Sequence, residues 1–365
     1  MKLLMTADAV GGVWTYALDL CSALSKHDVE VVLATMGPRP ADAQRRAARM
    51  LKNVQLVESD YRLEWMENPW DDVGAAGEWL LDLAASNAVD LIHLNGYSHA
   101  ALPWRRPVVC VGHSCVSTWW QAVHGTRPPK QWDEYRRRVM DGLNSADVVI
   151  APTAAFLQDL RSAYTFTRPA RVIRNGRASA GYSCDVLREP IVLACGRPWD
   201  VSKNLRVLDE ASRDAPWHVY VIGNIFGPDG QVFRPSAVQA IGMQSEHEVR
   251  GWMHRASVFV HPALYEPFGL VVLEAAAAGC ALVLADIPTL RELWHDAAEF
   301  FNPKSSSDLR ATVEMLLKDP ARQQALAMAA RTRADAYRIE SLAAEYLESY
   351  RTLLRERTSK ERTAA

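Results

Sequence analysis

The sequence SVFVHPALYEPFGLVVLE, residues 257–274, passes from a short apolar run through a loop into a helix pattern. The predicted strand ends at His261, and the helix begins near Phe268 or Gly269. The first turn of a helix leaves backbone N–H groups without partners, here those of Phe268, Gly269 and Leu270, and a glycine lets a ligand approach the backbone closely. This order of strand, loop and helix predicts an anion-binding site.

Two carboxylates frame this predicted anion site. Glu266 lies in the loop, and Glu274 lies in the second turn of the helix. Glu274 stands between Leu273 and a run of four alanines, so we expect it to be partly buried, where an unpaired charge is costly. A ribose diol would satisfy this carboxylate with two hydroxyls, as in dinucleotide-binding folds. A salt bridge inside the domain is the alternative.

Outward from this stretch, short apolar runs alternate with helical patterns along the chain. Such alternation predicts an α/β fold with parallel sheets covered on both faces, that is, Rossmann-like doubly wound domains. The predicted strands are residues 2–6, 29–34, 54–57, 90–94, 108–111, 148–151, 191–194, 218–222, 258–261, 281–284 and 299–301. The predicted helices include residues 13–25, 41–52, 72–86, 204–213, 246–255, 269–278 and 305–317.

The alternation is interrupted once, which predicts two domains. A loop-rich segment at residues 175–190 separates residues 1–175 from residues 185–338, and 365 residues suit two domains at roughly 100 to 200 residues each. The tail is an amphipathic helix, and its part at residues 340–360 could pack back on the first domain. Ligands of open parallel sheets bind beyond the carboxyl ends of the strands, so we expect the site in a cleft between the domains.

The composition is that of an average globular protein, with 49% hydrophobic and 23% charged residues and a net charge of −2. That charge disfavours a nucleic-acid partner. No apolar run approaches the roughly 18 residues of a spanning helix, and the first residues show no signal peptide. The six cysteines have no zinc-finger spacing. We therefore expect a cytoplasmic protein without a transmembrane segment, and with peripheral membrane contact at most.

The double-Glu segment closely resembles the signature of glycosyltransferase family 4, in which two Glu residues flank a seven-residue spacer containing Phe-Gly-Leu. Here the spacer is residues 267–273. The resemblance implies the GT-B fold, with two Rossmann-like domains facing a central cleft. It further implies that Glu274 binds the donor ribose and that Glu266 lies near the transferred sugar. The main chain of Phe268, Gly269 and Leu270 would face the sugar and phosphate.

A second match to this family lies at the start of the C-terminal domain. Arg197 follows the strand at residues 191–194, and Lys203 opens the next helix. The resemblance implies that both cations hold the departing diphosphate in place of a metal ion, so we expect no metal and no cofactor other than the nucleotide-sugar co-substrate. Many members have four residues between the Arg and the Lys, whereas this chain has five, residues 198–202.

The N-terminal half resembles the family more loosely. Gly11-Gly12 matches a glycine loop that faces the donor phosphates and the acceptor, although a tight turn alone would explain it. No G-x-G-x-x-G dinucleotide fingerprint is present in the chain. His113 matches a histidine that meets the donor sugar across the cleft, although a structural role is an alternative. Aromatic faces stack on sugars, so the acceptor candidates, with packing as the alternative, are Trp14, Trp119 and Trp120.

The resemblance implies a retaining glycosyltransferase of carbohydrate biosynthesis. It would move a hexose from a nucleotide-diphosphate sugar, UDP- or GDP-linked, to a hydroxyl of a small-molecule, glycan or lipid-linked acceptor. Two other functions stay open: a GT-B sugar-nucleotide epimerase or hydrolase, and a non-catalytic sugar-nucleotide sensor. The candidate catalytic residues are Glu266, His113, Arg197 and Lys203.

Overall fold

The computed structural model describes residues 1–178, 188–227 and 230–364. The chain forms two compact units. The first comprises Met1–Gln121, Thr126–Ala178 and Ile339–Ala365, and the second comprises Ala122–Gly125 and Ser179–Arg338. The predicted start of the second domain at residue 185, like Cys184, lies outside the described residues. The five described cysteines are free thiols.

The first unit contains a seven-stranded sheet in which all paired strands are parallel. Its strand order is β3-β2-β1-β4-β5-β6-β7. The first four strands in sequence are β1 (Lys2–Asp8), β2 (Glu30–Met36), β3 (Val54–Glu58) and β4 (Leu91–Leu94). They are followed by β5 (Val108–Val111), β6 (Val148–Ala151) and β7 (Ala170–Val172).

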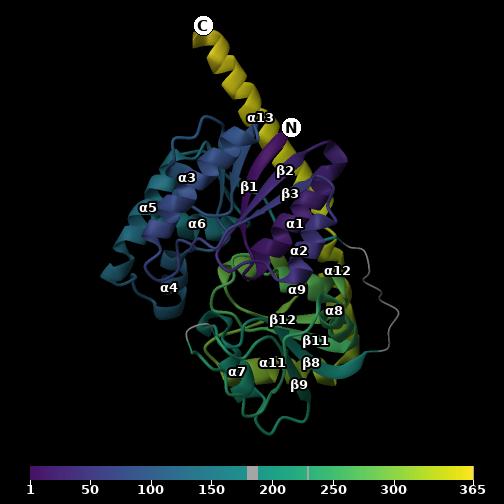
Figure 1. Cartoon of the computed structure of the whole chain (residues 1–365). Coiled ribbons are helices and arrows are strands. Elements are labelled where there is room, and N and C mark those ends of the chain that lie inside the picture. The colour runs from purple at the N-terminus through teal and green to yellow at the C-terminus, as the bar shows by residue number, and fades with distance from the viewer. Residues whose placement is uncertain (179–187, 228–229, 365) are drawn as a thin grey trace. The chain divides into compact units, whose positions relative to one another are not determined.

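Helices cover both faces of this sheet, because right-handed crossovers change face where the strand order reverses. Figure 1 shows α1 and α2 on one side of β1 to β3 and α3 and α5 on the other. The helices of this unit are α1 (Gly12–Leu24), α2 (Asp42–Arg49), α3 (Trp70–Ser86), α4 (Val116–His124), α5 (Asp133–Ser145), α6 (Ala154–Ala163) and α13 (Ile339–Ala364). Three short 3-10 helices connect them: η1 (Ser25–His27), η2 (Ser98–Ala101) and η3 (Lys130–Trp132).

The C-terminal helix α13 belongs to the first unit although it follows the second unit in sequence. Its Tyr350 hydroxyl lies 2.6 Å from His93 Nδ1 of β4. Ser349 Oγ accepts a hydrogen bond of 3.0 Å from the Arg171 guanidinium of β7. Tyr346 and Tyr350 are fully buried, so the apolar stripe of the tail helix is part of the core of this unit.

The second unit contains a six-stranded parallel sheet of the order β10-β9-β8-β11-β12-β13. Its strands are β8 (Glu189–Cys195), β9 (His218–Ile222), β10 (Gln239–Gly242), β11 (Ala256–His261), β12 (Ala281–Ala285) and β13 (Glu299–Phe301). Its helices are η4 (Val201–Lys203), α7 (Leu205–Ala211), α8 (Glu246–Arg255), α9 (Leu270–Ala277), α10 (Pro288–Trp294), α11 (Ser306–Lys318) and α12 (Pro320–Ala334).

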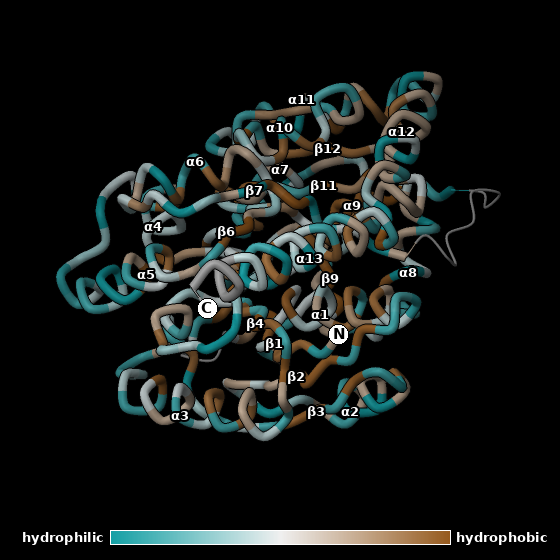
Figure 2. The backbone as a smooth tube through the Cα atoms, turned by 90° about the horizontal axis from the view of Figure 1, so that it is seen from above, coloured by the Kyte–Doolittle hydropathy of each residue, from teal (hydrophilic) through white to brown (hydrophobic). Residues whose placement is uncertain are grey.

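Burial explains why the apolar runs form strands. The runs in β4, β5, β6, β11 and β12 are buried along their whole length, as expected for sheets covered on both faces. In Figure 2 the strands are mainly brown, whereas the surface helix α2 is mainly teal. The fold class, two doubly wound parallel-sheet domains, is confirmed. Of the strands described, β7 and β10 were not predicted, because neither contains a continuous apolar run.

Each sheet reverses its strand order at one point, between β1 and β4 in the first unit and between β8 and β11 in the second. Ligands of open α/β sheets bind outside the carboxyl ends of the strands at such a switch point. The segments that follow these four strands are therefore the places where a site is expected. None of the described helices is long and apolar enough to cross a membrane.

Candidate functional site

In the second unit, an ion pair joins the two strands of the switch point. Lys203 Nζ, after β8, lies 2.8 Å from Glu266 Oε2, in the loop after β11. His261 Nε2, at the end of β11, lies 3.1 Å from the same oxygen. The side chains of Lys203 and Glu266 are only 18% and 13% exposed. A cation, a carboxylate and an imidazole thus meet at this point.

The electrostatics of Glu266 follow from these two neighbours. Burial by itself raises the pKa of a carboxyl, because it removes water from the charged form. The positive charge of Lys203 and the hydrogen bond with His261 outweigh that effect, and the pKa of Glu266 lies well below its usual range. Glu266 is therefore ionised at neutral pH, and it can accept hydrogen bonds but has no proton to donate.

Backbone contacts hold the Glu266 loop in place. Thr289 Oγ1, at the start of α10, donates a hydrogen bond of 2.7 Å to the Glu266 carbonyl. The Leu264 N–H donates one of 2.8 Å to the carbonyl of Ser202, the residue before Lys203. The loop after β11 and the η4 turn are therefore fixed to each other, which positions both ends of the Lys203–Glu266 pair.

The helix α9 begins directly beside Glu266. Gly269, its N-cap residue, has φ 85° and offers no side-chain cap. A Cβ at Gly269 would lie 3.2 Å from both Glu266 Cγ and Val272 Cγ2, so both the backbone conformation and the space favour glycine here. Phe268 is buried with its ring against Tyr337. The helix terminus thus presents main chain rather than the Phe268 ring to a ligand.

Glu274 lies on the second turn of α9 and is half-buried. Its charge, added to the larger effect of burial, raises the pKa of the Cys195 thiol to about 12. Cys195 is the last residue of β8. The Glu274 carboxylate therefore lies near the carboxyl end of β8.

Arg197, two residues after β8, is the more exposed of the two predicted cations. Its Nη2 lies 2.8 Å from Asp200 Oδ2, and 43% of its side chain is exposed. Its guanidinium also lies over the Trp199 ring, 5.4 Å from the centroid. Asp200 Oδ1 accepts hydrogen bonds from the Ser202 N–H and hydroxyl. The five residues before Lys203 thus fold around Asp200 into the η4 turn, and Lys203 still reaches the loop after β11.

In the first unit, Gly11 and Gly12 connect β1 to α1 and are exposed. Gly11 is the N-cap of α1 with φ 94° and no side-chain cap. A Cβ there would meet nothing within 4 Å, so the backbone conformation alone requires glycine. Asp8 Oδ1 accepts a hydrogen bond of 2.8 Å from the Val10 N–H and stabilises the turn. This terminus presents main chain at the switch point of the first sheet.

His113, two residues after β5, is fixed by Asn95, the residue after β4. Its Nε2 lies 2.8 Å from Asn95 Oδ1, and its ring meets that of Tyr16 edge-on at 4.5 Å. Burial, and to a lesser extent the nearby His93, lowers the pKa of His113 to about 3. His113 is therefore a neutral imidazole at physiological pH.

The three predicted acceptor tryptophans differ in exposure. Trp14 is 6% exposed and belongs to the buried face of α1, which leaves little surface for an acceptor. Trp119 and Trp120 of α4 are half-buried, with ring centroids 6.0 Å apart. The Trp120 indole N–H donates to Thr126 Oγ1 at 3.3 Å. Of the three, only the α4 pair presents aromatic surface.

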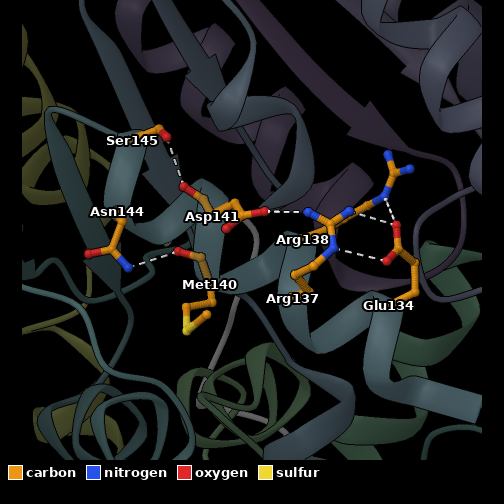
Figure 3. Close-up of polar contacts among 7 residues, drawn as sticks. All are labelled: Glu134, Arg137, Arg138, Met140, Asp141, Asn144 and Ser145. Carbon is orange, nitrogen blue, oxygen red and sulfur yellow. Dashed lines mark hydrogen bonds and ion pairs between the residues drawn. The ribbon is translucent and has the colours of Figure 1, made fainter. Parts of the chain in front are cut away.

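Residues 136–138 of α5 are three consecutive arginines, and Figure 3 shows Arg137 and Arg138 in contact with acidic side chains of the same helix. Arg137 pairs with Glu134 and Asp141, each at 2.7 Å. Arg138 pairs with Glu134 at 2.7 Å and lies over the Trp70 ring, and Arg136 lies 3.8 Å from Asp133. These arginines are therefore neutralised by acids of their own helix, as expected for a solvated helix face.

The sequence reasoning missed several residues of these sites. A signal was present for His261, which ends a strand five residues before Glu266, and for Asn95, which directly follows another strand. No local signal marks Thr289, whose role comes from its tertiary contact with the Glu266 carbonyl. Asp200 was not predicted either, although its contacts with Arg197 and Ser202 are local. Within the part of the chain that the structure describes, no cluster of three or more His, Cys, Asp or Glu residues could hold a metal ion.

Comparisons with known proteins show the family of this chain. The family model described as Glycosyltransferase Family 4 matches residues 10–178, and that described as Glycosyl transferases group 1 matches residues 231–333. The chain belongs to glycosyltransferase family 4. The first matched segment contains Gly11, Gly12 and the loop after β4, and the second contains Glu266 and α9.

Among curated proteins, this family 4 member is 41% identical over 99 residues to a glycogen synthase of Mycobacterium tuberculosis. The match covers 27% of this chain and 24% of that protein, so the chain spans about a quarter of that relative's length.

Among solved structures, sucrose-phosphate synthase from Thermosynechococcus elongatus has a TM-score of 0.80 at 19% identity, covering 98% of this chain and 100% of that one. Anabaena Alr3699/HepE in complex with UDP-glucose has a TM-score of 0.76 at 18% identity, covering 96% and 100%. Identities this low show the GT-B fold alone.

Proposed function

We propose that this family 4 protein is a retaining glycosyltransferase that moves a hexose from a nucleotide-diphosphate sugar, UDP- or GDP-linked, to a hydroxyl of an acceptor. The observation that carries the proposal is the Lys203–Glu266 pair at the switch point of the second sheet, 2.8 Å apart and beside the uncapped terminus of α9. A cation and a helix N-terminus attract a phosphate. An ionised carboxylate beside them accepts sugar hydroxyls.

The diphosphate is the leaving group in this reaction, and negative charge develops on it as the sugar departs. Main-chain N–H groups at Gly269 and Leu270, together with Lys203 and Arg197, would stabilise that charge. Each charge-assisted hydrogen bond contributes about 1.5 to 3 kcal/mol. An arriving diphosphate would compete with Asp200 for Arg197 and with Glu266 for Lys203. No protein-bound metal enters this scheme.

The transfer breaks the bond between the anomeric carbon and the diphosphate oxygen, and it forms a bond from that carbon to the acceptor oxygen. In a retaining reaction the acceptor attacks from the face that the diphosphate leaves, so its hydroxyl proton can pass to the departing phosphate oxygen. Glu266, ionised because of Lys203 and His261, would orient the sugar and stabilise positive charge on it. Glu274, near the end of β8, would accept hydrogen bonds from the ribose hydroxyls.

The comparisons support a nucleotide-sugar donor. A structural neighbour over 96% of this chain, Alr3699/HepE, is described in complex with UDP-glucose. A relative that matches 27% of this chain is named a glycogen synthase. A cytoplasmic location, with no more than peripheral membrane contact, completes the proposal.

The proposal is tested by thermal unfolding of the full chain with a panel of UDP-, GDP- and ADP-sugars, since binding to the native state raises the unfolding temperature. We expect one nucleotide to raise it, and its sugar to appear on an added acceptor with unchanged anomeric configuration. Rapid turnover of the donor without acceptor would instead indicate an epimerase or hydrolase. Binding without turnover across the acceptor panel would indicate a sensor.

A further inference from the structure

Asn95 connects the ends of two strands in the first unit through its side-chain amide. Its Nδ2 lies 2.7 Å from the Thr6 carbonyl oxygen of β1. Since that carbonyl can only accept, the group facing it must be the NH2 of the amide, and the orientation of the Asn95 side chain is fixed. Its N–H also donates to Thr6 Oγ1 at 2.9 Å.

The other side of the amide faces two histidines. Asn95 Oδ1 lies 2.8 Å from His113 Nε2 and 3.2 Å from His93 Nε2. An amide oxygen has no proton, so each Nε2 must carry one and donate it. His93 then has a bare Nδ1, and the Tyr350 hydroxyl, 2.6 Å away, donates to it. The Tyr16 hydroxyl oxygen, 3.5 Å from His93 Nε2, can share the proton of that nitrogen. The contacts thus connect Tyr350 to His113 through His93 and Asn95.

Both imidazole rings are neutral, so each ring has one protonated and one unprotonated nitrogen. Burial lowers the pKa of His93 to about 4, and burial with the neighbouring His93 lowers that of His113 to about 3. A neutral imidazole has a single N–H. With that proton on Nε2, His113 Nδ1 has only a lone pair, and among the described residues none forms a hydrogen bond with it.

We propose that Asn95 is a positioning residue that fixes His113 in its Nε2-protonated tautomer, so that Nδ1 accepts a hydrogen bond from a hydroxyl of a sugar substrate. This inference rests on the proposed glycosyl transfer for the identity of the ligand. A lone pair attracts an O–H and repels a phosphate oxygen. His113 therefore selects for a sugar hydroxyl, and it neither holds the diphosphate nor donates a proton.

The tautomer can be read directly on the full chain labelled with 15N-histidine. Long-range 1H–15N correlation spectra distinguish Nε2–H from Nδ1–H, and the His113→Gln variant identifies the His113 signals. We expect Nε2–H for His113 at pH 7 in the protein without ligand. An Nδ1–H tautomer, or a doubly protonated ring, overturns the proposal. Because this measurement needs no substrate, its result is separate from any failure of the proposed function, which would appear as no turnover with any nucleotide sugar.

The effect on substrate is tested with Asn95→Ala, using UDP-glucose or whichever panel sugar binds. Without the amide, His113 should show both tautomers, and kcat/KM should fall roughly fivefold, as for the loss of one neutral hydrogen bond. Asn53→Ala is the matched control, because Asn53 Nδ2, like Asn95 Nδ2, donates to the backbone of this unit, here to the carbonyls of Cys21 and Val29. An equal fall in both variants, or an unchanged His113 tautomer in Asn95→Ala, contradicts the positioning role.

Discussion

Lys203 Nζ lies 2.8 Å from Glu266 Oε2, although 62 residues separate the two in sequence. The contact joins the segment after β8 to the segment after β11, the two strands at which the second sheet reverses its order. Since His261 approaches the same carboxylate oxygen, Glu266 is shared by two donors. Because Lys203 and Glu266 neutralise each other, the loss of either side chain leaves the other as a mostly buried, unpaired charge.

Removing Glu266 should lower both stability and turnover, whereas removing Lys203 as well should restore part of the stability and none of the turnover. Glu266→Gln keeps the shape but leaves Lys203 unpaired and 18% exposed, so we expect unfolding free energy to fall by about 1 to 3 kcal/mol. Adding Lys203→Met should restore part of that loss. Activity should fall about tenfold or more in both variants. Urea unfolding and steady-state rates measure the two effects, and the exposed pair Lys26–Glu340, treated in the same way, is the control.

Arg197→Ala should lower turnover about tenfold or more while leaving the fold intact, because the guanidinium would stabilise charge only on the departing diphosphate. Arg197 is 43% exposed and pairs locally with Asp200, so its loss should change stability little. Donor-saturation kinetics and circular dichroism provide the measurements. Arg137→Ala on α5, where the arginine is paired with Glu134 and Asp141 of its own helix, should leave turnover unchanged. Full activity in Arg197→Ala would remove this residue from the mechanism.

Gly269→Ala tests the start of α9. Alanine at φ 85° is strained, and its Cβ would press on Glu266 Cγ, so we expect about 1 kcal/mol of destabilisation together with a several-fold loss of kcat/KM. Gly279, just after the same helix, has φ 83°, and a Cβ there would meet the end of the Arg188 side chain. Gly279→Ala should therefore destabilise the protein without the kinetic loss. Equal kinetic losses would argue against a role for the α9 terminus.

Stability should depend on pH through His93. The pKa of this buried residue is lowered to about 4 in the folded protein, against about 6.5 in the unfolded chain. The unfolded chain binds the proton first, so stability is fully present above pH 6.5 and decreases as the pH falls from 6.5 towards 4. The difference between the folded and unfolded pKa values of His93 corresponds to roughly 3 kcal/mol of unfolding free energy. In His93→Gln, urea unfolding between pH 7 and 4 should show a smaller decrease, and an identical slope would contradict this account.

Periodicity predicted much of the fold because burial on both faces of a parallel sheet requires continuous apolar runs. Each strand predicted from such a run is present within two residues at either end, for example β6 and β11. The edge strands β7 and β10 are short and partly exposed, so they lack the continuous apolar run from which the other strands were predicted. Glu266, Gly269 and Glu274 could be named from sequence because they lie within one local strand, loop and helix.

Local periodicity and residues adjacent in the chain are enough to specify the two parallel sheets and the helix terminus beside Glu266. Which groups meet at that terminus depends on contacts between segments far apart in the chain. Lys203 reaches Glu266 only because β8 and β11 are neighbours in the sheet. Asn95 can fix His113 only because β4 and β5 end side by side. Charges and protonation states depend on such long-range contacts, because a pKa responds to burial and to neighbours in space.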